Sequence, residues 1–315
     1  MKRLGRSALL FTAIGLAIYA GVYWGAERLT YRTGHGNPFF KIATAREATF
    51  DWVILGASHA MPLDFDDFNA RMERDLGLRI LNLAAPGAGP LYNRFVLEGF
   101  LREHRGRNLL YVVDSFAFYS RTWNEDRFAD AKLLRRTPLQ AATARRLWNY
   151  VRHEGVDARA ALDYVTGFSK VSNPERFQRD AWEGEAQFDQ VLRPSTSAVK
   201  KRIAYLYPEQ TSPGALERYL GVLASLVDLA QREGMRVAVV KTPVPPGYRS
   251  QLPDEAAFDE TLARLLAKHQ VPLHDFSGSL SEPRFYFDSD HLNRAGLTEF
   301  LARDLRGVLE SGSAR

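Results

Sequence analysis

Hydrophobic runs of two lengths organise this sequence. The longest uncharged run extends from Ser7 to Ala26 and follows the basic residues Lys2, Arg3 and Arg6. Beyond residue 50, short apolar runs that end near glycine, proline or aspartate alternate with longer stretches of helical periodicity. The short runs predict β-strands at Trp52–Leu55, Arg79–Ala84, Leu109–Val113, Arg236–Lys241 and Val271–His274.

Helical periodicity separates most of these predicted strands. It predicts helices at Leu91–His104, Ala215–Arg232, Glu255–His269 and about Ala295–Leu309. Strands that alternate with helices of this length require right-handed crossovers, which produce a mostly parallel sheet with helices on both faces. We therefore predict a three-layer α/β fold of the SGNH or flavodoxin-like kind, in which functional residues gather at the carboxyl ends of the strands.

Two segments interrupt this alternation. Residues 120–207 contain Arg-rich amphipathic stretches, such as Thr143–His153 and Ala158–Val171, and predict a helical insertion in the same domain. Residues 27–50 are mixed and rich in turn-forming residues, which predicts a stalk. The expected organisation is an anchor in residues 1–26, then the stalk, then one α/β domain in residues 51–315.

The N-terminal apolar run predicts a transmembrane helix. Residues 7–26 would form about 30 Å of helix, the thickness of the hydrocarbon core of a bilayer. Tyr19, Tyr23 and Trp24 resemble an interfacial aromatic belt at its far end, and the basic flank places its start in the cytoplasm. We expect a single-pass inner-membrane protein with its domain on the periplasmic, extracytoplasmic side. A cleavable signal peptide is the alternative, but these bulky aromatic residues are unlike a small-residue cleavage site.

Composition narrows the possible partners and cofactors. The chain is 45% hydrophobic and 25% charged, which allows a sizeable core. Its formal net charge is +5, but acidic and basic residues are interleaved, so no nucleic-acid partner is expected. The absence of cysteine excludes disulfides and a thiol nucleophile. His59, His274 and His291 lack metal-ligand spacing, and we expect neither a metal nor another cofactor.

Ser58 is the first candidate for chemistry. It belongs to Gly56-Ala57-Ser58 and directly follows the first predicted strand of the domain. A Gly-x-Ser turn there exposes the hydroxyl and aims backbone N–H groups at a reacting carbonyl. By itself, the same tripeptide is also typical of a plain turn or a helix cap.

Asp288 and His291 form the second candidate, just before the last predicted helix. An aspartate three residues ahead of a histidine on one loop can orient the imidazole as a general base. The alternative is that Asp288, Asp290 and Asn293 only cap the helix. The two candidates support each other because they fall at the carboxyl ends of the first and last strands of one predicted sheet.

Together these motifs resemble the SGNH (GDSL-type) hydrolase superfamily. The resemblance rests on Gly56-Ala57-Ser58, on Asn82–Gly87 after the second strand and on Asp288-x-x-His291. It covers roughly residues 51–309 without the insertion. It implies that Ser58 is the nucleophile, His291 the base and Asp288 its orienter. It also implies that the backbone N–H groups of Ser58 and Gly87 form an oxyanion hole.

One motif departs from the family pattern. The family usually has Gly-x-Asn-Asp after the third strand, where the asparagine is a third oxyanion donor, but this chain has Val113-Asp114-Ser115-Phe116. Ser115 is a candidate replacement. His59, next to the nucleophile, is a candidate contact for the acyl group or a donor protein, or a residue that stacks on the loop.

This departure, together with a membrane anchor, resembles SGNH-like proteins that help to O-acylate exported bacterial polysaccharides. The resemblance implies a serine esterase or O-acyltransferase acting on a small acyl group, most simply acetyl, of an exported carbohydrate. It also implies a multispanning membrane acyltransferase as a partner. The alternative is a catalytically degenerate SGNH-like domain that binds glycan or scaffolds a membrane complex.

Two other enzyme folds fit the sequence less well. An α/β-hydrolase requires G-x-S-x-G, but Ala60 occupies the second glycine position. A dinucleotide-binding fold requires G-x-G-x-x-G after the first strand, and the partial match at residues 87–90 follows the second strand.

Overall fold

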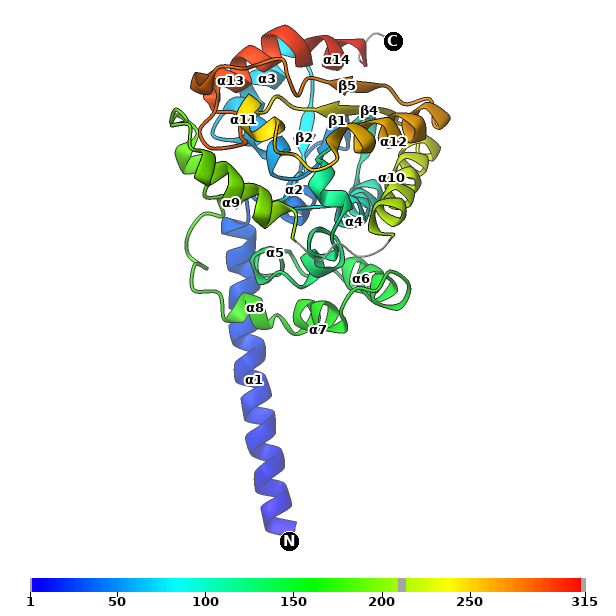
Figure 1. Ribbon diagram of the computed structural model, residues 1–315. Helices are drawn as coiled ribbons and strands as arrows, with labels where there is room; N and C mark the ends of the chain where they lie inside the picture. Colours follow the sequence, from blue (N-terminus) through cyan, green and yellow to red (C-terminus); the bar gives the residue numbers. More distant parts are fainter. Residues whose placement is uncertain (1, 209–213, 313–315) are drawn as a thin grey trace.

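A parallel five-stranded sheet forms the centre of the computed structural model, which describes residues 2–208 and 214–312 (Figure 1). The strand order is β2-β1-β3-β4-β5, and each pair of neighbours runs parallel. This is the doubly wound, flavodoxin-like order, and it confirms the predicted α/β class. The strands are β1 (Thr49–Leu55), β2 (Ile80–Asn82), β3 (Arg105–Val112), β4 (Arg236–Lys241) and β5 (Leu273–Asp275).

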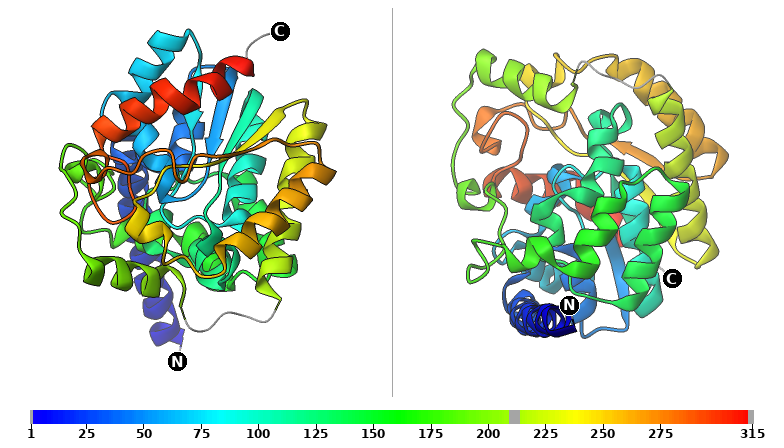
Figure 2. Two further views of the ribbon diagram at one scale, coloured as in Figure 1. Left: turned by 45° about the horizontal axis from the view of Figure 1, so that its top comes forward. Right: turned by 90° about the horizontal axis from the view of Figure 1, so that it is seen from below.

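Helices cover both faces of the sheet (Figure 2). Val53 and Leu55 of β1 belong to one core cluster, whereas Trp52 and Ile54 belong to a second cluster on the opposite face. Residues 52–55 of β1 are therefore continuously apolar, as expected for a strand segment buried on both sides. The first cluster includes α4 (Pro90–Glu103), α10 (Ala215–Arg232) and α12 (Glu255–Lys268), and the second includes α3 (Phe68–Leu76) and the C-terminal helices.

The C-terminal helix forms as predicted but contains one wide turn. α13 (Arg294–Phe300) continues through a π-helical turn (Leu301–Leu305) into α14 (Arg306–Ser311). Asn293 caps its start by accepting a hydrogen bond from the Gly296 backbone N–H at 2.9 Å. The cap fixes the loop that carries Asp288 and His291 relative to the second core cluster.

Residues 115–207 carry helices and no strand among the described residues. Their α-helices are α5 (Ala131–Leu134), α6 (Ala141–His153), α7 (Ala158–Thr166), α8 (Phe168–Val171) and α9 (Thr196–Leu206), and the short α11 (Pro246–Arg249) follows β4. Among the described residues, the 3₁₀ turns are Ser58–Asp64, Ser115–Phe118, Arg121–Trp123, Glu125–Ala129, Glu185–Gln187 and Pro283–Phe285.

The helix expected at Ala158–Val171 is broken at Gly167. This residue has a φ of +70°, and the ring of Tyr23 lies where a Cβ atom would stand. A glycine is required at such a point, because other residues rarely adopt this conformation and would meet the tyrosine. The result is a sharp corner between α7 and α8.

The N-terminal helix α1 (Lys2–Thr33) projects away from the domain (Figure 1). It is long and apolar enough to cross a membrane, with a mean hydropathy of 1.6 over its most apolar window. Its last turns contact the domain, where Ala26, Thr30 and Thr33 are buried.

Residues 27–50 differ from the expected stalk. α1 continues to Thr33, and α2 (Pro38–Thr44) buries Phe39, Phe40 and Ile42 against the domain. Asn37 caps α2 by accepting hydrogen bonds from the N–H groups of Phe39 and Phe40. Pro38, which suggested a turn, is instead the first residue of this helix, where its missing N–H costs nothing.

Candidate active site

The turn after β1 presents Ser58. Gly56 has a φ of +153°, and a Cβ atom there would lie 2.8 Å from the Val112 carbonyl oxygen of β3. Glycine therefore allows the chain to leave the sheet close to its neighbouring strand. Ser58 opens a short 3₁₀ turn at the carboxyl edge of the sheet, and it is buried.

Asp288 and His291 meet Ser58 in a hydrogen-bonded relay. The His291 Nε2 atom lies 2.9 Å from the Ser58 Oγ atom, and its Nδ1 atom lies 2.9 Å from both carboxylate oxygens of Asp288. The Asp288 carboxylate also accepts a hydrogen bond from the His291 backbone N–H at 2.8 Å. The predicted serine, base and orienter thus lie in contact, in the arrangement that general-base activation of a serine requires.

Aromatic side chains cover the imidazole of His291. Phe287 stacks on it with ring planes 6° apart and centroids 5.5 Å apart. Trp182, from the insertion, packs edge-on against the same imidazole, with ring centroids 4.9 Å apart. Only 1% of the His291 side chain is exposed, compared with 35% for Asp288. The relay is therefore shielded from water on the histidine side, which strengthens its electrostatic interactions.

A second charged cluster lies beside the relay. His59 Nδ1 hydrogen-bonds to Asp114, which follows β3, and His59 Nε2 lies 3.3 Å from Asp290. Arg202 of α9 donates a hydrogen bond to Asp290 at 2.8 Å. The rings of His59 and His291 are 4.8 Å apart. The contacts of Asp290 with His59 and Arg202 are not those of a residue that only caps the last helix.

Carboxylates hold this cluster in its charged form. Burial alone would lower the pKa of His59, but Asp114 and Asp290 outweigh it and raise the pKa to about 10. Burial opposes ionisation of Asp290 too, yet the neighbouring His291, His59 and Arg202 side chains hold its pKa well below the usual range. His59 is therefore a buried imidazolium at neutral pH.

The relay and the cluster beside it contain more carboxylates than fixed cations. The carboxylates are those of Asp114, Asp288 and Asp290. The fixed cations are His59 and Arg202. This set carries one net negative charge while His291 is neutral. Asp288, which contacts His291 directly, is the carboxylate placed to orient the imidazole towards Ser58.

Gly87 lies in the loop after β2, next to the turn of Ser58. The Ala85 N–H donates a hydrogen bond to the Gly56 carbonyl at 3.3 Å, which ties the two loops together. Gly87 has a φ of +62°, and a Cβ atom there would lie 2.7 Å from the Trp123 ring. A residue other than glycine would be strained and would clash, as expected where backbone must approach closely. Its role as an oxyanion donor remains a prediction.

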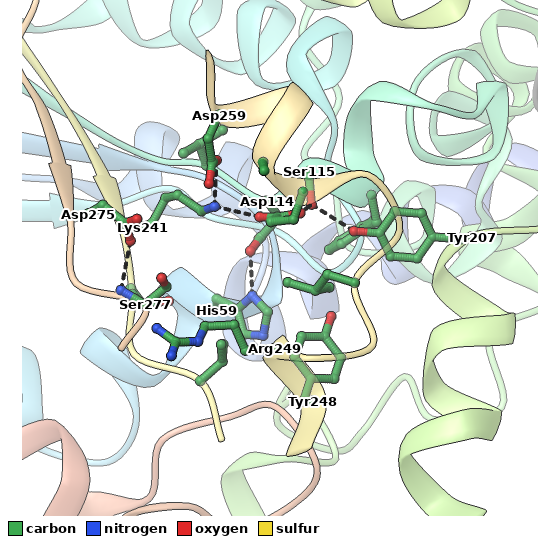
Figure 3. Close-up of a pocket in the computed structure, with 17 residues that line it drawn as sticks. His59, Asp114, Ser115, Tyr207, Lys241, Tyr248, Arg249, Asp259, Asp275 and Ser277 are labelled. Atoms are coloured by element: carbon green, nitrogen blue, oxygen red, sulfur yellow. Dashed lines mark hydrogen bonds and ion pairs between the residues drawn. The ribbon is translucent and has the colours of Figure 1, made fainter. Parts of the chain in front are cut away.

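Ser115 is engaged away from the relay. Its hydroxyl lies 2.7 Å from the Tyr207 hydroxyl and donates to Glu255. Ser115 and His59 both line a cavity of about 230 Å³ at the carboxyl ends of β3, β4 and β5 (Figure 3). Ser58 and His291 are not among its lining residues, so His59 stands between this cavity and the relay.

The site does not offer a complete set of metal ligands. Within residues 2–208 and 214–312, one candidate group brings ligand atoms of His59, Asp290 and His291 within 4.8 Å of one another. His291 already uses both ring nitrogens on Ser58 and Asp288, and Asp114 occupies one nitrogen of His59. Two remaining ligands are fewer than protein metal sites ordinarily use, so the donor set fits an ion-pair network better.

No protein-family model matches this chain, and no curated protein matches its sequence. Several solved structures match it. A presumed acylhydrolase from Bacteroides fragilis has a TM-score of 0.43 and 10% identity, over 87% of this chain and 94% of its own. A GDSL-like lipase from Bacteroides thetaiotaomicron has a TM-score of 0.41 and 9% identity, over 86% of this chain and 94% of its own. TesA has a TM-score of 0.33 and 12% identity, over 71% of this chain and 76% of its own. Likeness at this level establishes neither a family nor an activity.

Sequence patterns indicated the relay but not the cluster around it. Asp290 belongs to the loop that carries Asp288 and His291, yet only the fold brings it to His59 and Arg202. Asp114 belongs to the motif after β3 that departs from the family pattern, and that departure is the one sequence signal that pointed to this side of the site. Arg202 comes from the insertion, where no motif marks it.

Proposed function

We propose that this chain is a membrane-anchored serine esterase or O-acyltransferase. The observation that carries the proposal is the contact of Ser58, His291 and Asp288, with 2.9 Å between the His291 Nε2 and Ser58 Oγ atoms. Ser58 Oγ attacks the ester carbonyl while its proton passes to His291, and the alcohol departs with that proton. Water or a sugar hydroxyl then resolves the acyl-enzyme and returns the proton to Ser58.

The substrate we propose is a small acyl group, most simply acetyl, on an exported polysaccharide. Trp182 and Phe287 pack against His291, which favours a small acyl group over a long chain. α1, with its basic start, supports anchoring in the inner membrane with the domain on the periplasmic side. A multispanning acyltransferase in the same membrane would be a suitable source of acyl groups.

A second candidate function is glycan binding or scaffolding without turnover. The motif after β3 lacks the oxyanion-donating asparagine of the family pattern, and Ser115, its candidate replacement, is bound to Tyr207 and Glu255. Loss of one oxyanion donor typically lowers kcat by about 100-fold to 1000-fold. A site that lacks more than one donor would not be a useful esterase.

A serine-directed probe distinguishes these functions. A fluorophosphonate should label the detergent-purified full chain at Ser58, and the variant Ser58→Ala should not be labelled. Ser115→Ala is the matched control, because it removes a neighbouring buried hydroxyl outside the relay, and it should label like the wild type. Absence of labelling in folded wild-type protein, or equal labelling of Ser58→Ala, would overturn the enzyme proposal.

The substrate proposal needs its own measurement. The purified protein should release acetate from p-nitrophenyl acetate or from an acetylated glycan, and cells with His291→Ala should show altered glycan acetylation. Release of acetate from the ester combined with unchanged glycan acetylation in cells would support the chemistry and exclude this substrate.

A further inference from the structure

The corner between α7 and α8 lies alongside the part of α1 that we propose to be in the membrane. The Tyr19 hydroxyl donates a hydrogen bond to the Thr166 carbonyl at 3.0 Å, and the Tyr23 ring packs on Gly167. One helical turn further, Glu27 pairs with Lys170. The domain therefore holds α1 from Tyr19 onwards, and Figure 1 shows α7 and α8 at the end of the domain from which α1 projects.

The free part of α1 is too short to span a bilayer by itself. Ser7 and Tyr19 are separated by about 18 Å of helix, at about 1.5 Å per residue. The hydrocarbon core is about 30 Å thick. Arg3 and Arg6 prevent the helix from sliding deeper, because burial of their charges is costly. The span must therefore continue to about Ala26, and the last ~10 Å of it carries the corner alongside.

The exposed surface of this corner is apolar. Leu162 is 53% exposed, Val165 46% and Phe168 66%. Leu162 and Val165 are three residues apart and share one face of α7. Arg159, a further three residues back on that face, is exposed and suited to the phosphates of lipid headgroups. A solvent-facing surface would not normally gather three large apolar side chains beside an apolar helix.

Three polar side chains at the corner form hydrogen bonds within the chain. The Thr166 hydroxyl donates to the Leu162 carbonyl at 2.8 Å, and the Ser172 hydroxyl donates to the Phe168 carbonyl at 2.7 Å. Asp163 accepts from the Ser169 backbone N–H at 2.8 Å. Internal satisfaction of this kind lowers the cost of leaving water for lipid.

From these observations we infer that the α7–α8 corner (residues 162–168) is inserted into the outer leaflet of the bilayer beside α1. Two parts of the chain would thus lie in the bilayer: α1, which crosses it, and the α7–α8 corner, which enters only one leaflet. This inference rests on α1 spanning the membrane and does not depend on the proposed catalytic chemistry.

Cysteine-directed fluorescence tests the inference, because the chain contains no cysteine of its own. The full-length variants Phe168→Cys, Ile14→Cys and Ala263→Cys would each carry one environment-sensitive fluorophore in vesicles of phosphatidylcholine and phosphatidylglycerol. Ile14 lies within the proposed span. Ala263 is exposed on α12, which lies away from α1 (Figure 1). Spin labels on the lipid acyl chains should quench positions 14 and 168 at least twofold more than position 263.

Two results would overturn the inference, and they differ from each other. Quenching at position 14 but not at 168 would show that α1 spans the membrane while the corner stays in water. Absence of quenching at both positions would show that α1 does not span the membrane. Labelling of Ser58 by the serine probe in the same preparations reports on the catalytic proposal separately.

Discussion

The relay of Ser58, His291 and Asp288 and the neighbouring pair of His59 with Asp114 use the same side-chain types, yet they differ in what faces each imidazole. His291 contacts a carboxylate on one side and a serine hydroxyl on the other. His59 has a carboxylate on both sides, and its pKa is raised to about 10. One histidine can therefore exchange a proton with Ser58, whereas the other stays charged and neutralises buried carboxylates.

Loss of the orienting carboxylate should give the largest effect. In Asp288→Asn the side chain keeps its shape but no longer stabilises the imidazolium of His291, so we expect kcat to fall about 10⁴-fold. Asp288 is 35% exposed, so the unfolding midpoint should change little. Steady-state hydrolysis of p-nitrophenyl acetate measures the change. Asp189→Asn, at a surface ion pair with Arg294, is the matched control and should retain wild-type kcat.

Loss of the charged histidine should affect stability first. His59→Gln leaves Asp114 and Asp290 without their shared cation in a buried place, which should lower the free energy of unfolding by about 3–5 kcal/mol. Urea denaturation measures this. The double variant His59→Gln/Asp114→Asn should lose less than the sum of the two single variants, since the partners are in contact. Additive losses would contradict the pairing.

The same pair predicts a direction for the pH dependence of stability. Because the pKa of His59 is raised from 6.5 to about 10, its contribution is complete below pH 6.5 and is lost as the pH rises towards 10. The pKa of Asp290 is lowered from 3.8, so its contribution to the free energy of unfolding is complete above pH 3.8 and is lost as the pH falls below that value. The stability difference between wild type and His59→Gln should therefore shrink from pH 6.5 to 10.

Removal of the aromatic cover should change selectivity more than rate. Trp182→Ala opens the space beside His291, so hydrolysis of butyrate relative to acetate esters should increase by about tenfold. The ratio of kcat/KM for the two nitrophenyl esters measures this. An unchanged ratio would mean that Trp182 does not border the acyl group.

The smallest effect is expected at Ser115. Its hydroxyl is held by Tyr207 and Glu255, so Ser115→Ala should change kcat by less than about threefold, whereas loss of an oxyanion donor would lower kcat about 100-fold or more. The same esterase assay decides between these outcomes. A 100-fold loss of kcat would instead identify Ser115 as an oxyanion donor.

The sequence allowed the alternating elements to be predicted because their burial is regular. α10 begins and ends at the predicted residues Ala215 and Arg232, and β4 coincides with its apolar run. α2 was missed because Pro38 and the nearby glycines are typical of turns, and only the cap from Asn37 shows that a helix begins there. Propensity cannot distinguish a free turn from a helix start when the deciding interaction is a single side chain.

The site was predictable where its residues are close in sequence or belong to a motif. Asp288 and His291 share one loop, so their contact follows from spacing. The contact of His59 with Asp114 depends on β1 lying beside β3, and the contact of Asp290 with Arg202 depends on how the insertion folds back. Such contacts arise from tertiary packing, and no local pattern of one sequence contains them.

Ser58 and His291 are 233 residues apart, at the two ends of the α/β domain. A chain synthesised from its N-terminus therefore presents its serine long before the base that activates it exists. While the polypeptide emerges, this serine is an ordinary alcohol, and the relay closes only after the final loop has folded onto the sheet. The relay therefore depends on the part of the α/β domain that is synthesised last.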